Sequence, residues 1–391
     1  METTYTINER VAAIQPSLTL AITSRAKEMA ATGCKVCSFA AGEPDFDTPE
    51  PIRNAAVQAL ARGETRYTPE SGLLTLRQAV CAKLMRENGL SYEPDQVVIS
   101  NGAKHSLSLL FTMLCRPGDE VIIPGPFWLS YPEMVNVAGG KPVPVVCAES
   151  SGFKLSPEKL ESVITPRSKV LILNSPCNPT GIVYDESELR ALVEVAVRHG
   201  LLIVSDEIYE KMVYDGVRHV SPASFSPETY AHTVTVNGFS KAFAMTGWRL
   251  GYLAAPRPLA KAAGALQSHL ASAPNTFAQH GAVQALQGGD EAARHMVSAF
   301  EKRRNTLLER LNGIAGITCV RPSGAFYAFP NIRQFKLDSI TFCQRLLEEK
   351  AVAAIPGKVF GSDDNIRLSY ACSLEIIQEG MDRLGRFVAS L

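Results

Sequence analysis

The chain has 391 residues, of which 46 % are hydrophobic and 20 % are charged. This composition is typical of a globular protein and excludes a disordered or collagen-like chain. Its 39 basic and 39 acidic residues cancel to a formal net charge of zero, so no overall field draws the protein to nucleic acid or to an anionic membrane. We therefore expect no nucleic-acid or membrane partner.

The sequence also predicts the cellular compartment and the state of the cysteines. No apolar run reaches the roughly 18 residues of a membrane span, and residues 1–6 lack the basic and apolar regions of a secretory signal. A cytoplasmic location is expected. The nine cysteines are odd in number, which argues against a disulfide framework. Cys34 and Cys37 form a C-x-x-C pair without a second pair or nearby histidine, so we expect thiols and no metal.

Short apolar runs alternate with helical stretches along most of the chain, which is typical of an α/β fold. Residues 9–33 are expected to be helical after Pro16. Residues 186–199 carry apolar side chains at helical spacing. Five runs are predicted strands, and the most apolar of them suit a parallel sheet buried on both faces; the runs are 96–100, 120–124, 169–174, 201–205 and 233–237.

The last hundred residues predict a separate α+β unit. A helix is expected from about residue 290 to 312, followed by strands at 317–320, 325–329 and 365–369 and helices at 340–349 and 374–391. The lengths of the two end segments suit pieces that pack together. We therefore expect a large domain of residues 50–290 and a smaller domain built from residues 1–49 and 291–391.

Polar residues follow the predicted strands, at the edge where an open parallel sheet binds its ligands. Residues 101–104 open a helix whose free N–H groups favour a phosphate. Asn178 lies in a turn shaped by two prolines and a glycine, Asp206 ends a buried strand, and Lys241 follows another. Each feature alone is more often structural. Together they are the groups that pyridoxal 5′-phosphate requires.

Several segments together resemble the class I pyridoxal-phosphate-dependent aminotransferases. Residues 240–251 are similar to the lysine motif of that family, and matching segments follow the family's order at 41–49, 174–181, 205–210, 321–327 and 365–370. The resemblance is closest to the bacterial aspartate and aspartate/prephenate aminotransferase subgroup. It implies fold type I of the pyridoxal-phosphate-dependent transferases, with a mostly parallel central sheet in the large domain and a smaller α+β domain.

The resemblance implies how individual residues bind the cofactor. Lys241 would form the Schiff base and move the proton at the substrate Cα, and Asp206 would pair with the pyridine nitrogen. Asn178 and Tyr209 would hydrogen-bond the phenolate oxygen, and Trp128 would stack on the ring. The phosphate would be bound by Gly102, Ala103, Lys104, Ser240 and Arg249 and, across a homodimer interface, by Tyr67 of the partner subunit.

The same resemblance implies a site for a dicarboxylic substrate. Arg367 would bind the α-carboxylate through two parallel hydrogen bonds, which a lysine cannot reproduce. The other implied substrate-binding residues are Gly42, Lys104, Trp128, Asn178, Ser268 and Gln15. Lys104 would bind the second carboxylate, helped by Ser268. Gln15 stands where prephenate-using relatives carry lysine, which leaves prephenate use open.

These residues imply transfer of the amino group from L-aspartate to 2-oxoglutarate in two half-reactions, giving oxaloacetate and L-glutamate. Leu270 and Ala271 replace a more polar run of the subgroup, and could admit aromatic or aliphatic side chains. The alternatives are an aspartate/prephenate or aromatic aminotransferase, or another enzyme of the fold such as a β-lyase, decarboxylase or synthase. A non-enzymatic effector-sensing module is disfavoured because Lys241, Asp206 and Arg249 are all retained.

Overall fold

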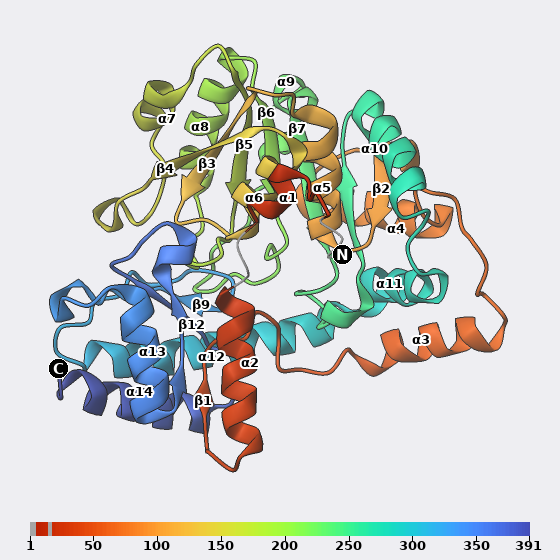
Figure 1. The fold of residues 1–391 in the computed structure, drawn as a ribbon. Helices are drawn as coiled ribbons and strands as arrows, with labels where there is room; N and C mark the ends of the chain where they lie inside the picture. Colours follow the sequence, from red (N-terminus) through yellow and green to blue (C-terminus); the bar gives the residue numbers. More distant parts are fainter. Residues whose placement is uncertain (1–4, 15–17) are drawn as a thin grey trace.

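The computed structural model describes residues 5–14 and 18–391, and its main feature is a seven-stranded sheet (Figure 1). The strand order is β2-β8-β7-β6-β5-β3-β4. All neighbouring strands are parallel except β8, which is antiparallel to β2 and β7. The strands are β2 (Val97–Ser100), β3 (Glu120–Gly125), β4 (Lys141–Val146), β5 (Ser168–Asn174), β6 (Leu202–Asp206), β7 (Thr233–Gly238) and β8 (Gly251–Ala254).

The five strands predicted for this sheet are confirmed, and two others had weak sequence signals. The strand β4 is an edge strand with prolines at positions 142 and 144, and proline weakens a strand assignment because it cannot donate to the ladder. The strand β8 has only four residues. Both therefore lack the long apolar run that identifies β5 and β6.

Helices cover both faces of the sheet (Figure 1). The predicted helix at 186–199 is α8 (Glu186–Arg198), which begins at a capping box made by Asp185 and Glu188; such a box satisfies free N–H groups of the first turn. The remaining helices of this unit are α3 (Glu50–Ala61), α4 (Leu74–Asn88), α5 (Ala103–Leu114), α6 (Ser130–Ala138), α7 (Pro157–Val163), α9 (Pro227–Ala231), α10 (Arg257–Leu270) and α11 (Thr276–Gly288).

A second unit joins the two ends of the chain. Its antiparallel sheet has the order β11-β12-β9, and β1 pairs in parallel with β10. Figure 1 shows α2 and β1 in red beside the blue C-terminal elements. The elements are α2 (Leu18–Ala31), β1 (Cys37–Ser38), α12 (Asp290–Asn312), β9 (Tyr327–Ala328), α13 (Ser339–Lys350), β10 (Val352–Ala353), β11 (Ile355–Pro356), β12 (Ile366–Ser369) and α14 (Leu374–Val388).

Two details of this unit differ from the sequence-based expectation. The strand expected at 317–320 is wrong, since its only pairing is an isolated bridge between Thr318 and Asn331; Thr318 is exposed, and Pro322 follows closely. The short helix α1 (Glu9–Ala12) contacts α6 of the large sheet unit. The domain boundaries at residues 49/50 and 290/291 stay a prediction.

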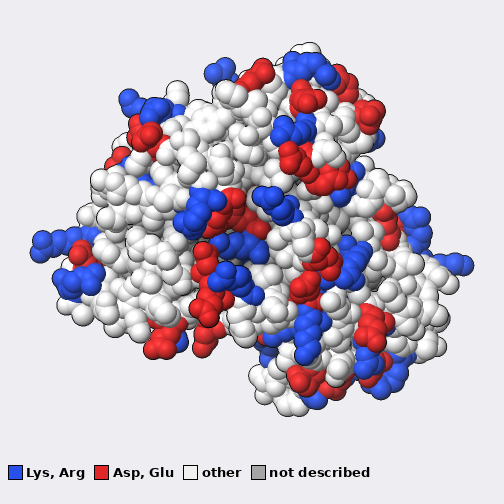
Figure 2. Space-filling model, turned by 180° about the vertical axis from the view of Figure 1, so that it is seen from behind, with Lys and Arg blue, Asp and Glu red and all other residues white. Residues whose placement is uncertain are grey.

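The charge balance of the sequence is also visible on the surface. On the face drawn in Figure 2, acidic and basic side chains lie interspersed. Among the described residues, none of the helices is both long and apolar enough to cross a membrane.

Candidate active site

A cavity of about 490 Å³ lies at the carboxyl ends of β5 and β6 and reaches from the large sheet to α2 and β12 of the second unit. It therefore lies at the edge where the sequence placed the ligand site. The predicted residues that line it are Gly42, Ala103, Lys104, Trp128, Asn178, Asp206, Tyr209, Ser240, Lys241, Arg249 and Arg367.

Asp206 is the acid of this cavity and is almost fully buried at the end of β6. One carboxylate oxygen accepts a 2.6 Å hydrogen bond from the Tyr131 hydroxyl, and the other accepts one of 3.3 Å from the Ile208 N–H. Burial raises the pKa of Asp206 to about 6. None of the ion pairs in the described part of the chain involves Asp206, so the cavity offers its carboxylate to a cationic ligand group.

Lys241 follows β7 and is half-buried at the cavity wall. Its Nζ donates a hydrogen bond to the carbonyl of Gly42. Burial lowers the pKa of Lys241 from 10.5 to about 8, and the positive charges of Arg367 and Arg249 act in the same direction, against the carboxylates of Glu43 and Asp206. About a tenth of this amine is therefore neutral, and nucleophilic, at pH 7, far more than for an ordinary lysine.

Arg249 lies across the start of α5 and forms a cationic corner of the cavity. Its guanidinium donates to the carbonyls of Thr246, at 3.0 Å, and Asn101, at 3.4 Å. Gly102 has a φ of +88°, and a Cβ there would lie 2.6 Å from Arg249 Nη2, so glycine is needed at this position. Burial and the charge of Arg249 both lower the pKa of nearby Lys104. With the free N–H groups of α5, this corner suits a phosphate.

Arg367 on β12 is buried, with only 4 % of its surface exposed. It donates to the Asn178 side-chain oxygen at 3.0 Å and to the Ala40 carbonyl at 3.2 Å, while its Nε has no partner among the described residues. The guanidinium lies 4.5 Å from the ring centre of Tyr327 and 5.0 Å from that of Phe360. Two aromatic rings thus hold a buried cation whose fork retains hydrogen-bonding capacity for a carboxylate.

Hydrogen bonds join the turn that carries Asn178 to strand β6. The Asn178 N–H donates to the Asn174 side chain at 2.9 Å, and Asn174 in turn donates to the Asp206 carbonyl at 3.0 Å. On the opposite wall, Lys104 Nζ lies 4.8 Å from the ring centre of Trp128. The amide, the acid and the aromatic wall are thus fixed around one space.

Three predicted residues do not line the cavity of this chain, and a fourth lies outside the described residues. Ser268 is exposed on α10 and donates to the Ala265 carbonyl of its own helix at 2.8 Å; its help to Lys104 stays a prediction. Gly102 lies behind the guanidinium of Arg249. Tyr67 is 91 % exposed, and Gln15 falls outside the described residues.

Several residues that line the cavity received no role from the sequence; three of them are Tyr131, Tyr327 and Asn174. Tyr131 follows Trp128 by three residues, one helical turn, so its place beside the ring-stacking position was the available signal. Tyr327 belongs to a family-like segment but carried no assigned function. Asn174 ends β5, as it ended the strand predicted at 169–174, and carried no assigned function.

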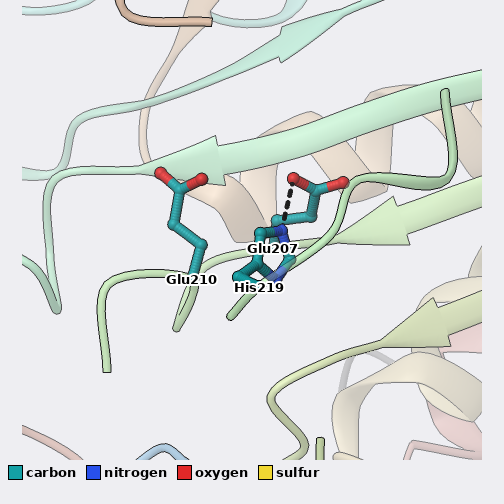
Figure 3. A group of neighbouring side chains, drawn as sticks. All are labelled: Glu207, Glu210 and His219. Carbon is teal, nitrogen blue, oxygen red and sulfur yellow. Dashed lines mark hydrogen bonds and ion pairs between the residues drawn. The ribbon is translucent and has the colours of Figure 1, made fainter. Parts of the chain in front are cut away.

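The segment that follows Asp206 is anchored by a separate buried polar network, drawn in part in Figure 3. Glu207 accepts hydrogen bonds from Ser205, Ser221 and His219 at 2.9, 2.6 and 2.9 Å. Glu210 pairs with Lys83, which is also buried. These carboxylates are therefore satisfied by protein groups on the side of β6 away from the cavity.

Comparison with known proteins assigns the family. Residues 35–384 match the model for aminotransferase class I and II. A Geobacillus stearothermophilus aspartate aminotransferase is 50 % identical over 97 % of this chain and 98 % of its own. A Cereibacter sphaeroides aspartate/prephenate aminotransferase is 45 % identical over 98 % and 99 %. The chain belongs to the class I and II aminotransferases and is an enzyme of that kind.

Solved structures agree with the predicted fold. The aspartate aminotransferase of Rhizobium meliloti superposes with a TM-score of 0.95 at 41 % identity, covering 99 % of each chain. That of Thermus thermophilus with maleate gives a TM-score of 0.93 at 44 % identity, covering 98 % of this chain and all of the other. The fold type I prediction is confirmed.

The lowered pKa of Lys241 predicts an unusual reactivity. In the protein without cofactor, modification of Lys241 by an amine-specific reagent should rise with pH through a midpoint near 8, because only the neutral amine reacts. Peptide mapping by mass spectrometry measures this rate residue by residue, with exposed Lys141 as the internal control. A midpoint near the ordinary value of 10.5 would contradict the burial argument.

Removing Lys83 should destabilise the fold, because Glu210 would keep a buried charge without its partner. We expect Lys83→Met to lower the free energy of unfolding by about 3–5 kcal/mol at pH 7. Lys141→Met, which removes an exposed lysine from buried Glu120, should have little effect because Thr165 and Arg167 still bind that carboxylate. Urea denaturation measures both.

The Lys83→Met effect should depend on pH. Burial alone raises the pKa of Glu210, but Lys83, His219 and Asn88 together lower it to about 2 in the folded protein. A lowered folded-state pKa gives stability above the unfolded-state value of 4.5, lost as the pH falls toward 2. The difference between wild type and variant should therefore shrink over this range; a constant difference would show that packing, not charge, is responsible.

Proposed function

We propose that the chain is an aspartate aminotransferase that uses pyridoxal 5′-phosphate. The observation that carries the proposal is the charge pattern of the cavity. Within the described residues, no acidic side chain forms an ion pair with Lys104, Lys241, Arg249 or Arg367. Arg367 is buried and Lys241 half-buried, while Lys104 and Arg249 are exposed at the cavity. A cation removed from water without an acidic partner favours an anionic ligand.

The residues present fit this cofactor. The corner formed by Arg249, Ser240 and the start of α5 suits its phosphate, and Asp206, which is buried without a cation, suits a protonated pyridine nitrogen. Lys241 presents an amine of lowered pKa between these two groups. When bound, the cofactor supplies an aldehyde that condenses with amines and a ring that withdraws electrons from the substrate Cα.

The remaining residues would bind and orient the substrate. Arg367 offers two donors to an α-carboxylate, and the exposed backbone at Gly42 adjoins the same space. Lys104 lies on the opposite wall against Trp128 and would bind the second carboxylate of aspartate or 2-oxoglutarate. Lys241 would accept the proton from the substrate Cα and pass it to the cofactor carbon that carried the aldehyde, and in the second half-reaction it would move a proton in the opposite direction.

The relatives support this choice of substrate. The two bacterial relatives described above are named for aspartate, one of them also for prephenate. Leu270, which suggested a more apolar pocket, is 62 % exposed on the end of α10 and does not line the cavity of its own chain. A dicarboxylic substrate therefore has more support than an aromatic substrate.

We also propose a homodimer. Tyr67, Val57 and Leu60 leave 91 %, 62 % and 43 % of their surfaces exposed, which is unusual for large apolar side chains that lie close in sequence. Sedimentation should give twice the mass of the 42.3 kDa chain; a monomer at micromolar concentration would contradict this. A cytoplasmic location remains the expectation.

The proposed activity is tested with aspartate and 2-oxoglutarate, following oxaloacetate, with prephenate and neutral amino acids in the same panel. Lys104→Ala should lower kcat/KM for aspartate roughly tenfold to a hundredfold, since a charged hydrogen bond contributes about 1.5–3 kcal/mol. For a neutral amino donor the loss should be small. Lys261→Ala, which removes an exposed lysine of α10 that does not line the cavity, is the matched control.

Two outcomes would overturn parts of this proposal. A protein that gains no visible absorbance with pyridoxal 5′-phosphate would contradict the cofactor assignment. Equal losses for aspartate and neutral donors in Lys104→Ala would remove Lys104 from substrate selection while leaving transamination intact.

A further inference from the structure

Tyr327 joins two parts of the active site that the sequence treated separately. It lies on β9 with 1 % of its surface exposed. Its hydroxyl is 3.0 Å from that of Tyr209, and the two rings stand nearly perpendicular with centres 5.8 Å apart. On its other side the ring supports the Arg367 guanidinium at 4.5 Å. A single buried residue therefore touches both the residue proposed for the cofactor oxygen and the one proposed for the substrate carboxylate.

The hydroxyl pair has a directional constraint, because each phenol carries one proton. If Tyr209 donates to Tyr327, it has no proton left for a ligand in the cavity. If Tyr327 donates, Tyr209 keeps its proton and presents it to the ligand. No other partner of the Tyr209 hydroxyl is found in residues 5–14 and 18–391. The function proposed for Tyr209 therefore requires Tyr327 to be the donor.

The backbone holds Tyr327 in place for both contacts. In the β9–β12 pair, Tyr327 lies opposite Ser369, two residues from Arg367 on the same strand. Ala325, with a φ of +54°, donates its N–H to the Met212 carbonyl at 2.9 Å, and Met212 is three residues beyond Tyr209. The β9 segment is thus bonded to the strand that carries Arg367 and to the turn that carries Tyr209.

We propose that Tyr327 is a positioning residue with two functions: its hydroxyl donates to Tyr209 and frees the Tyr209 proton for a ligand oxygen, and its ring orients Arg367 for a carboxylate. This inference rests on the proposed function. Donation by Tyr327 also polarises the Tyr209 hydroxyl, since hydrogen bonds in a chain strengthen one another by about 10–30 %.

The hydroxyl is tested with Tyr327→Phe, which keeps the ring, in protein loaded with pyridoxal 5′-phosphate and without substrate. The readout is the pH midpoint of the visible absorbance change. A donor to the phenolate oxygen favours its ionised form, so we expect Tyr327→Phe to raise the midpoint by a few tenths of a pH unit. Tyr209→Phe should raise it further, and the double variant should match Tyr209→Phe alone.

Tyr370→Phe is the matched control for the hydroxyl. Tyr370 is equally buried, and its hydroxyl donates to the Ala325 carbonyl of the same segment at 3.3 Å. Removing it tests whether loss of any buried hydroxyl here moves the midpoint. We expect the wild-type midpoint in this control.

The ring is tested by the affinity for maleate, measured through the same absorbance. Tyr327→Phe should bind maleate within about twofold of wild type, because the aromatic face remains. Tyr327→Leu should raise the dissociation constant roughly threefold to thirtyfold, as expected for loss of a desolvated cation–π contact. The difference in maleate affinity between the two variants distinguishes the contribution of the ring from that of the hydroxyl.

The outcomes distinguish this inference from the function on which it rests. A visible band in wild type with an unchanged midpoint in Tyr327→Phe, or with additive shifts in the double variant, would overturn the hydroxyl function. Unchanged maleate affinity in a folded Tyr327→Leu would overturn the ring function. Absence of the band in wild type would instead overturn the proposed cofactor.

Discussion

The cavity depends on one electrostatic constraint: four cations line it, and among the described residues none of them forms an ion pair with an acidic side chain. Arg367 is buried and Lys241 half-buried, and removing such groups from water is costly unless an opposite charge compensates. The protein lowers this cost by other means. Burial lowers the pKa of Lys241, which allows the neutral amine, and aromatic rings and carbonyls support Arg367. The positive charge that remains uncompensated is available to bind anionic ligands.

The two units of the fold supply different residues of the cavity. The large sheet supplies Asp206 and Lys241 at the ends of adjacent parallel strands, where short, buried hydrogen-bonded strands fix their positions. The second unit supplies Arg367 from β12. A ligand that contacts Asp206, Lys241 and Arg367 at once would therefore need both units in place. The cavity therefore takes functional residues from both units.

Much of this arrangement follows from the sequence. Apolar runs such as those of β5 and β6 predict buried strands from the sequence alone. The polar residue after each run is then expected at the carboxyl edge of the sheet. Tyr131 and Tyr327 were not assigned because their function comes from contacts across the fold: Tyr131 is 75 residues from Asp206, and Tyr327 is 118 from Tyr209. The sequence pattern around a residue does not show which distant residues it contacts in the fold.

The neighbours Asp206 and Glu207 show what distinguishes a functional acid from a structural one. Successive side chains of a strand point to opposite faces, so one carboxylate faces the cavity and the other faces the network of Figure 3. Glu207 is surrounded by donors from the protein itself, including His219. Asp206 accepts only a phenol and a backbone N–H, which orient it without supplying a positive charge. Since both acids are buried, burial alone does not separate their roles. The difference is the missing cation, and a ligand with a protonated ring nitrogen would supply it.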